Sequence, residues 1–238
     1  MEEKFLVFDI WGDYAYFRRG YTTTSTISFP FPSRTTIAGI ISAILGLKRD
    51  QYYEIFSKEH SKIGLRILNP IQRYKFNLNY INTKDQKVLL TEVSEKGKRV
   101  QVQAEFLKNP KFRIYLSLDD EDLMNQLLEL LKNHKSIYTP YLGISECLAN
   151  FELVGDDFLF AEKEFDKNVD INSVILKEYY NILIEENRKY GLVKSPGFFD
   201  SERIVTEYLE YYFEEKGNSI KISEGEYYHI GDDNVILF

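Results

Sequence analysis

The chain has 238 residues, of which 44% are hydrophobic and 15% aromatic, and a formal net charge of −7. This composition is typical of a globular protein with a substantial core, which excludes a largely disordered chain. The single cysteine excludes an intrachain disulfide and indicates a reducing compartment. The longest apolar run, residues 37–47, is well short of the roughly 20 residues that span a bilayer. Because no stretch resembles a signal peptide either, we expect a soluble, cytoplasmic protein.

Charge is distributed unevenly along the chain. Residues 1–118 contain 19 basic and 11 acidic side chains, whereas residues 119–238 contain 11 basic and 26 acidic ones. The two halves therefore carry balances of +8 and −15, and such an asymmetry indicates different partners. The basic half is suited to RNA, and the acidic half is suited either to protein partners or to solvent.

Residues 4–11 are predicted as a central strand, because both faces of the strand are mostly apolar. Residues 18–47 follow, with a polar loop that leads into an apolar helix. Ser33 is a suitable N-cap after the FPFP sequence, isoleucines recur at helical spacing, and Gly46 ends the run. The small residues on the other face of this helix predict close packing against a sheet.

A fixed helix N-terminus offers unpaired N–H groups to an anion. The polar residues at and before this terminus predict phosphate binding, although an ordinary buried helix after a polar loop fits the pattern as well. The stretch lacks the GxxxxGK[ST] pattern of a P-loop, so ATP or GTP is not expected. The candidate phosphate-binding residues in this stretch are Arg18, Arg19, Tyr21, Thr22, Thr23, Thr24, Arg34, Thr35 and Thr36.

The elements expected after residue 47 complete a succession of strands and helices that is known from other folds. We expect a short helix at 50–58, a strand region at 63–81, a strand at 111–118, a helix capped by Asp119 and a strand within 146–160. Strand, helix, strand, strand, helix, strand is the ferredoxin-like or RRM-like order. The fold class is therefore α+β, with a ferredoxin-like domain over residues 1–161.

Two polar segments interrupt this domain. Residues 82–99 include Lys96, Lys98 and Arg99 and are predicted as an inserted β-hairpin with a basic tip, the alternative being a flexible loop. Residues 139–145 contain Gly143, which lets another backbone approach closely, or simply forms a turn.

Residues 162–238 are predicted as a small C-terminal α+β subdomain. A helical pattern covers 174–189, residues 194–200 break it, and strands are expected at 203–213, 219–222 and 235–238.

The sequence offers no catalytic constellation. The three histidines and the single cysteine are scattered, so neither a metal site nor a Ser/His/Asp arrangement is predicted. We predict no catalytic residue, no metal and no cofactor. Metal-free RNA cleavage stays an alternative, for which Tyr16, Tyr21, Lys48 and His60 are conceivable participants, but no spacing singles out a set.

The stretch FRRGYTTTSTISFPFPSRTTIAGIISAILGL resembles the N-terminal signature of the fifth CRISPR-associated (Cas) protein family, of the RAMP superfamily, and especially its type I-B branch. Weaker similarities lie in YTPYLGISECLA at 138–149 and in RIVTEYLEYY from residue 203. The resemblance implies a thumb at about 82–99 that packs against guide RNA and a neighbouring subunit. It also implies that the glycine loop, with Gly143 and Ser145, contacts RNA.

The resemblance further implies a non-catalytic subunit of a type I interference (Cascade) complex. Such a subunit grips the 5′ handle of crRNA and caps the backbone of the assembly, with the backbone and large subunits as its protein partners. Arg18, Arg19 and Arg34 would then pair with phosphates, and Tyr21 would stack on a base. One branch of the family processes repeat RNA, so a metal-independent endoribonuclease is one alternative; a protein-only scaffold is the other.

Overall fold

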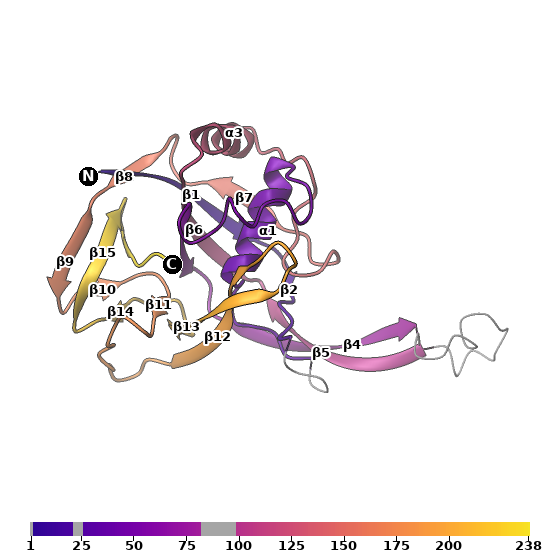
Figure 1. The fold of residues 1–238 in the computed structure, drawn as a ribbon. Helices are drawn as coiled ribbons and strands as arrows, with labels where there is room; N and C mark the ends of the chain where they lie inside the picture. Colours follow the sequence, from indigo (N-terminus) through magenta and orange to yellow (C-terminus); the bar gives the residue numbers. More distant parts are fainter. Residues whose placement is uncertain (1, 21–25, 82–98) are drawn as a thin grey trace.

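The computed structural model describes residues 2–20, 26–81 and 99–238. Its centre is an antiparallel sheet in the order β3-β6-β1-β7 (Figure 1), with β8 paired to the beginning of β1. The strands are β1 (Glu3–Trp11), β3 (Ser61–Ile67), β6 (Lys111–Leu118), β7 (Asn150–Leu153) and β8 (Leu159–Ala161). The predicted central strand is confirmed, since β1 has strand neighbours on both sides.

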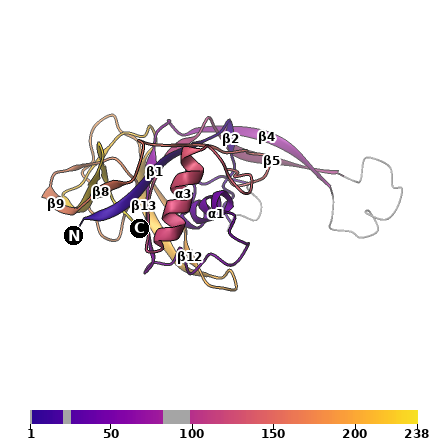
Figure 2. The same ribbon diagram turned by 90° about the horizontal axis from the view of Figure 1, so that it is seen from above.

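Two helices, α1 (Arg34–Leu45) and α3 (Glu121–Lys132), pack against each other and into the main core (Figure 2). The side chains of β1 alternate between two cores, as the pleat of a strand requires. Leu6, Phe8 and Ile10 enter the core that contains the helices, whereas Phe5 and Val7 enter a second core. The chain is therefore an α+β protein.

The predicted ends of α1 are confirmed. The Ser33 side chain accepts a hydrogen bond from the backbone N–H of Thr36, and Gly46 adopts a left-handed φ of 75°. The cap of α3 is Asp120 and not Asp119, because Asp120 accepts from the N–H of Leu123. Both caps satisfy donors that the helix itself cannot pair.

Strands β4 (Gln72–Ile81) and β5 (Arg99–Lys108) pair over ten residues and extend away from the body (Figure 1). We call them the β4–β5 arm. Its base is anchored by β2 (Tyr14–Ala15) and by ring contacts, with Tyr14 and Phe76 centred 5.0 Å apart and Tyr16 and Phe106 4.8 Å apart. Lys96 and Lys98 of the predicted thumb lie outside the described residues.

The C-terminal region, every residue of which is described from 162 to 238, contains strands and no helix. These strands form three small sheets: β16-β15-β9, β10-β14 and β11-β13-β12. Their bounds are β9 (Lys163–Lys167), β10 (Asp170–Ile171), β11 (Ile175–Leu176), β12 (Tyr190–Phe199), β13 (Val205–Glu214), β14 (Ile220–Lys221), β15 (Glu224–Ile230) and β16 (Asp233–Val235).

Two predicted helices are wrong. Residues 50–58 form turns, and residues 174–189, which were predicted as a helix, contain the short strand β11, turns and an isolated bridge from Ile182 to Ile222. Ile175 and Leu176 instead pair with Tyr212 and Tyr211 of β13, a long-range pairing that overrides the local periodicity. The predicted break at 194–200 belongs to β12, where an irregularity in the register beside Gly197 lets the strand continue.

The C-terminal strands share the cores of the first part of the chain. Val193, Leu209 and Phe213 belong to the main core, and β12 packs against α1. On the other face of the sheet, the buried Asp233 accepts hydrogen bonds from Arg66, Arg113 and Tyr115. Residues 162–238 are therefore joined to both faces of the central sheet.

Arg34 has a structural role that differs from the predicted contact with RNA phosphate. It is 2% exposed, and its Nε donates to the carbonyl of Phe238 over 3.1 Å. Its terminal nitrogens donate to the carbonyls of Phe56, Ser57 and Ser61, and to the Ser61 hydroxyl. The guanidinium lies 4.1 Å from the centre of the Phe198 ring. Burial lowers its pKa to about 10, and its donors are directed inward, so it does not reach a ligand at the surface.

We predict that Arg34→Lys destabilises the protein although the charge is kept. One ammonium cannot replace a fork that reaches several carbonyls, and each buried acceptor left unpaired costs about 1–3 kcal/mol. The free energy of unfolding in urea should fall by about 3 kcal/mol, whereas Arg18→Lys at an exposed position should change it by less than about 0.5 kcal/mol. Equal stability of the two variants would contradict this role.

Candidate nucleic-acid interface

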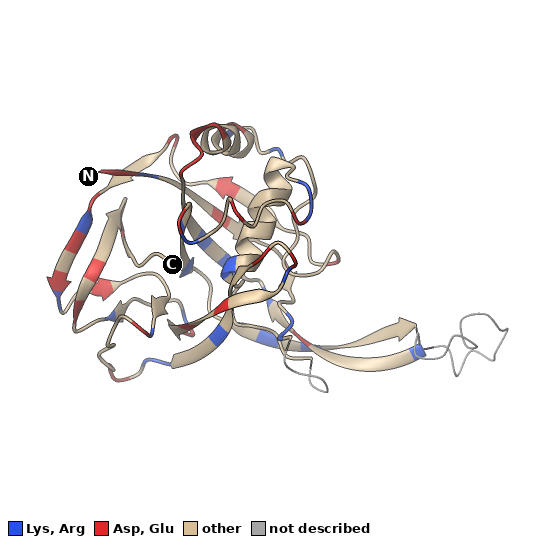
Figure 3. Cartoon of the chain, viewed as in Figure 1, with Lys and Arg blue, Asp and Glu red and all other residues tan. Residues whose placement is uncertain are grey.

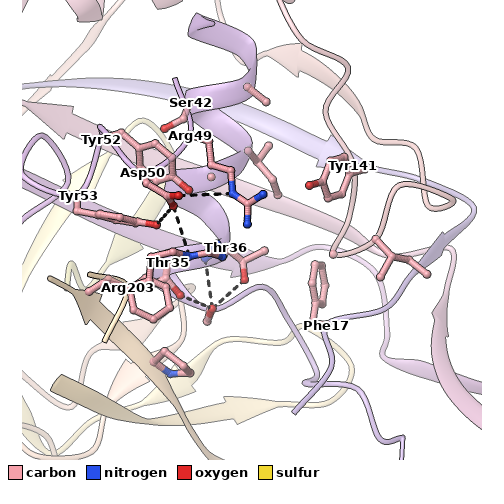
Figure 4. Close-up of a pocket in the computed structure, with 18 of the residues that line it drawn as sticks. Phe17, Thr35, Thr36, Ser42, Arg49, Asp50, Tyr52, Tyr53, Tyr141 and Arg203 are labelled. Carbon is pink, nitrogen blue, oxygen red and sulfur yellow. Dashed lines mark hydrogen bonds and ion pairs between the residues drawn. The ribbon is translucent and has the colours of Figure 1, made fainter. Parts of the chain in front are cut away.

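A cleft of about 940 Å³ lies along α1, and its other walls come from five parts of the chain. These are residues 16–20, Phe29, residues 47–53, the loop at 138–144 and the end of β12 with the turn after it. The N-cap Ser33 lines the cleft, and the first turn of α1 contributes Thr35 and Thr36 (Figure 4). The N-terminus of α1, with its partial positive charge, therefore lines an open cavity.

The small residues of α1 divide between two places. Ala38 is buried in the main core, in a helix that packs against β12, as predicted for a helix lying close to a sheet. Gly39, Ser42 and Ala43 line the cleft, where their short side chains leave room beside the helix.

The charged side chains among the described residues that line the cleft are mostly basic. They include Arg18, Lys48, Arg49 and Arg203, against the single carboxylate of Asp50. This local excess of positive charge contrasts with the net charge of −7 for the whole chain. Cationic side chains converging on a cavity attract phosphates, and they do so together with the helix N-terminus.

Asp50 joins the two arginines that flank it in space. Its Oδ1 accepts a hydrogen bond from the Tyr53 hydroxyl over 2.6 Å, and the same oxygen lies 3.4 Å from Nε of Arg203. Nε of Arg49 lies 3.6 Å from Oδ2. Burial and this hydrogen bond raise the pKa of Tyr53 to about 12, so its hydroxyl stays protonated and donates.

Aromatic side chains occupy the opposite wall. Tyr141 and Phe17 lie across the cleft from Arg49 in Figure 4. Tyr138 and Tyr141 are 54% and 45% exposed. The loop that carries them is held in place, because the N–H groups of Ile137 and Tyr138 donate to the last carbonyls of α1. Exposed rings opposite cations suit a single-stranded nucleic acid, whose bases stack while its phosphates pair.

Gly143 permits a close backbone contact, as predicted, and the second backbone belongs to this chain. Its φ is +97°, and a Cβ at this position would lie 2.0 Å from the carbonyl oxygen of Tyr16. The N–H of Tyr16 also donates to the carbonyl of Leu142 over 3.0 Å. The close approach at Gly143 therefore holds the loop at 138–144 against the segment that carries Arg18. The predicted contact of Gly143 with RNA stays a prediction.

Residues 5–195 match the model of a family described as CRISPR-associated protein (Cas_Cas5). The chain belongs to this family. No curated protein matches the chain.

Two solved structures are similar to this Cas5-family chain throughout. A CRISPR protein from Archaeoglobus fulgidus is 16% identical, with a TM-score of 0.51, over 99% of this chain and 98% of that protein. A chain of a CRISPR RNA-guided surveillance complex is 12% identical, with a TM-score of 0.56, over 91% of each chain. At these identities the similarity concerns the fold alone.

The structure brings only some of the predicted site residues of this Cas5-family chain together. Arg18, Thr35, Thr36 and Gly143 line the cleft. The remaining described candidates, Arg19, Arg34, Arg99 and Ser145, are not among its lining residues. Tyr21, Thr22, Thr23, Thr24, Lys96 and Lys98 lie outside the described residues.

The candidates outside the cleft have other contacts. Nε of Arg19 donates to the carbonyl of Ser28, and its guanidinium lies 5.4 Å from the centre of the Phe29 ring. Ser145 is exposed and donates to the Glu146 carboxylate. Arg99 is opposite Ile81 in the β4–β5 arm, far from α1 (Figure 1).

Sequence reasoning missed much of the cleft. It omitted Arg49, Arg203, Tyr138 and Tyr141, and it considered Lys48 only for catalysis. The adjacent Lys48 and Arg49 directly after the end of α1 were a usable signal, since residues beyond a helix C-terminus remain near its surface. Nothing in the sequence linked Arg203 to them.

The described catalytic candidates do not form one group. Tyr16 and Lys48 line the cleft, whereas His60 is exposed and lies 2.9 Å from the Asp119 carboxylate, which raises the pKa of the imidazole. Among the described residues, no three His, Cys, Asp or Glu side chains are placed to hold a metal ion. None of the described helices has the length and apolar character that crossing a membrane requires.

We predict that Gly143→Ala destabilises the protein far more than Gly155→Ala does. Both glycines have left-handed φ values, +97° and +81°, but a Cβ at Gly155 meets nothing within 4 Å. The matched variant therefore measures the conformational cost alone, about 1 kcal/mol, while Gly143→Ala adds a backbone clash and should cost about 3 kcal/mol or more. Urea unfolding of both variants tests this, and similar losses would show that the close approach to Tyr16 is unimportant.

Proposed function

We propose that this chain is a non-catalytic, crRNA-binding subunit of a type I CRISPR interference (Cascade) complex. In this proposal it grips the 5′ handle of the crRNA and caps the backbone of the assembly. The observation that carries the proposal is the cleft, in which cationic and aromatic walls face each other across a helix N-terminus. Membership of the Cas5 family supports it, as does the fold shared with a chain of an RNA-guided surveillance complex.

The architecture supports a ferredoxin-like RAMP assignment. The order β1, α1, β3, β6, α3, β7 along the chain, with the sheet order β3-β6-β1-β7, is the split βαβ pattern of that fold. The β4–β5 arm is then the stem of the thumb. Arg99, with the predicted Lys96 and Lys98, would hold RNA as it leaves toward the backbone subunit.

The proposed mechanism is recognition by charge and stacking. Phosphates pair with Arg18, Arg49 and Arg203, and the first turn of α1 adds N–H donors. A base stacks on Tyr141 at the opposite wall. Acidic residues lie on β9 and β15, away from the β4–β5 arm (Figure 3), where they suit protein partners such as the large subunit.

We predict that Arg49→Gln and Arg203→Gln together weaken binding of mature crRNA by about tenfold to a hundredfold at physiological salt, because each removes a charge-assisted hydrogen bond to phosphate. The salt dependence should become shallower, by about 0.7 in the log–log slope for each phosphate that the variant no longer neutralises. Lys167→Ala, which removes an exposed charge on the distant β9, is the control and should bind like the unaltered protein.

The same titrations decide between the three functions. Purified protein is incubated with labelled repeat RNA and with mature crRNA, without added metal, and both retention and cleavage are scored. Retention that prefers the handle, without a cut product, supports the proposal. Specific cleavage of the repeat that Lys48→Ala abolishes would make the chain a processing endoribonuclease, and absence of any RNA retention would favour a protein-only scaffold.

We predict that Tyr141→Ala weakens RNA binding by about five- to a hundredfold, whereas Tyr141→Phe leaves it nearly unchanged. Stacking needs the ring and not the hydroxyl, and removal of one stacking interaction costs about 1–3 kcal/mol. Fluorescence anisotropy with a labelled handle oligonucleotide measures both variants. Equal losses in the two variants would assign the effect to the hydroxyl, and no loss in either would remove Tyr141 from the interface.

A further inference from the structure

Asp50 is an unexpected residue in a cleft that binds a polyanion. It is the one carboxylate among the described lining residues, and its side chain is 40% exposed. A carboxylate in this position repels RNA phosphates and lowers the positive potential of the walls. If the cleft binds RNA, Asp50 must stabilise the bound state by some other interaction that outweighs this repulsion.

Three groups from two distant parts of the chain converge on this carboxylate. The Tyr53 hydroxyl donates to Oδ1 over 2.6 Å, which fixes the carboxylate to its own turn. Nε of Arg49 and Nε of Arg203 lie 3.6 and 3.4 Å from its two oxygens. Asp50 thus connects the turn after α1 with the turn between β12 and β13.

Both arginines face Asp50 through Nε. A guanidinium has five N–H donors in a rigid fork, so a contact at Nε leaves the terminal nitrogens for a ligand. Figure 4 shows the guanidinium of Arg49 extending from Asp50 into the cleft, toward the wall of Tyr141. This orientation suits a phosphate, which a fork can bind through two oxygens.

The backbone at this junction is unusual in both turns. Asp50 has a φ of 65° and Arg203 a φ of 64°, which non-glycine residues seldom adopt. The second turn is held by Asp200, whose Oδ1 accepts from the N–H groups of Glu202 and Ile204. The backbone is therefore constrained in both turns, at Asp50 and at Arg203, where the two turns meet.

We propose that Asp50 is a positioning residue that holds Arg49 and Arg203 as a two-arginine clamp for the phosphates of single-stranded RNA, a role that rests on the proposed function. Free arginine side chains lose rotamer freedom when they bind, and a carboxylate that orders them beforehand reduces this cost. The clamp needs Asp50 even though its charge opposes the ligand.

The direction in which Asp50→Asn changes the affinity for RNA tests this role. Asp50→Asn adds one positive charge to the cleft, so simple electrostatics predicts tighter RNA binding. Loss of the clamp predicts weaker binding, by about three- to tenfold, and a shallower salt slope. Asp50→Glu, which keeps the carboxylate, should recover part of the affinity. The titrations use the full chain and labelled handle RNA, and Asp232→Asn, at an exposed turn outside the cleft, is the matched control.

The same substitution in a variant that lacks both arginines distinguishes a positioning role of Asp50 from a general effect on the structure. In the Arg49→Gln/Arg203→Gln variant, Asp50→Asn should no longer weaken binding, because no clamp remains to be ordered. Weakening in that background, or tighter binding by Asp50→Asn alone, would overturn the role of Asp50 while the proposed function stands. Failure of the unaltered protein to retain RNA would overturn both.

Discussion

The buried guanidinium of Arg34 is the interaction on which much of this structure depends. It lies in the first turn of α1, and its donors reach the carbonyl of Phe238 and carbonyls within residues 56–61. A buried cation is tolerated only where its donors are satisfied, and here most of the partners are backbone carbonyls. The beginning of α1, the segment before β3 and the C-terminus are therefore held at one point.

This arrangement explains why the cleft forms where it does. With α1 held by Arg34 from inside, the opposite side of its first turn faces outward, and the small residues above it leave space. The loop at 138–144 is tied to the C-terminal end of α1 by hydrogen bonds and to Tyr16 by the close approach at Gly143. The end of β12 completes the wall, since β12 packs on the same helix. The cleft thus forms where several distant segments pack around one helix.

Net charge is a poor guide to the partner of this protein. The chain carries a charge of −7, yet the described cleft residues have an excess of cations, while many acidic residues lie in the strands beyond residue 160. Local potential, and not the sum over the chain, decides which ligand a cavity attracts. The acidic side chains of β9 and β15 lie away from the β4–β5 arm.

Elements that depend on neighbouring residues could be predicted from the sequence. The caps of α1, the central strand β1 and the succession β1, α1, β3, β6, α3, β7 follow from local patterns, and the structure has them. The signature around α1 also led to the family. Local periodicity failed at 50–58 and at 174–189, where turns and pairing with β13 replace the expected helices.

Which side chains form the cleft depends on long-range packing and could not be predicted from local sequence. Arg34 looks like a surface residue in sequence, and its burial depends on a carbonyl 204 positions away. Arg49 and Arg203 meet because β12 and β13 bring a distant turn to the end of α1, and no local pattern encodes that meeting. Secondary structure arises from short-range sterics and hydrogen bonds, whereas a site assembled from distant segments exists only once long-range packing has brought them together.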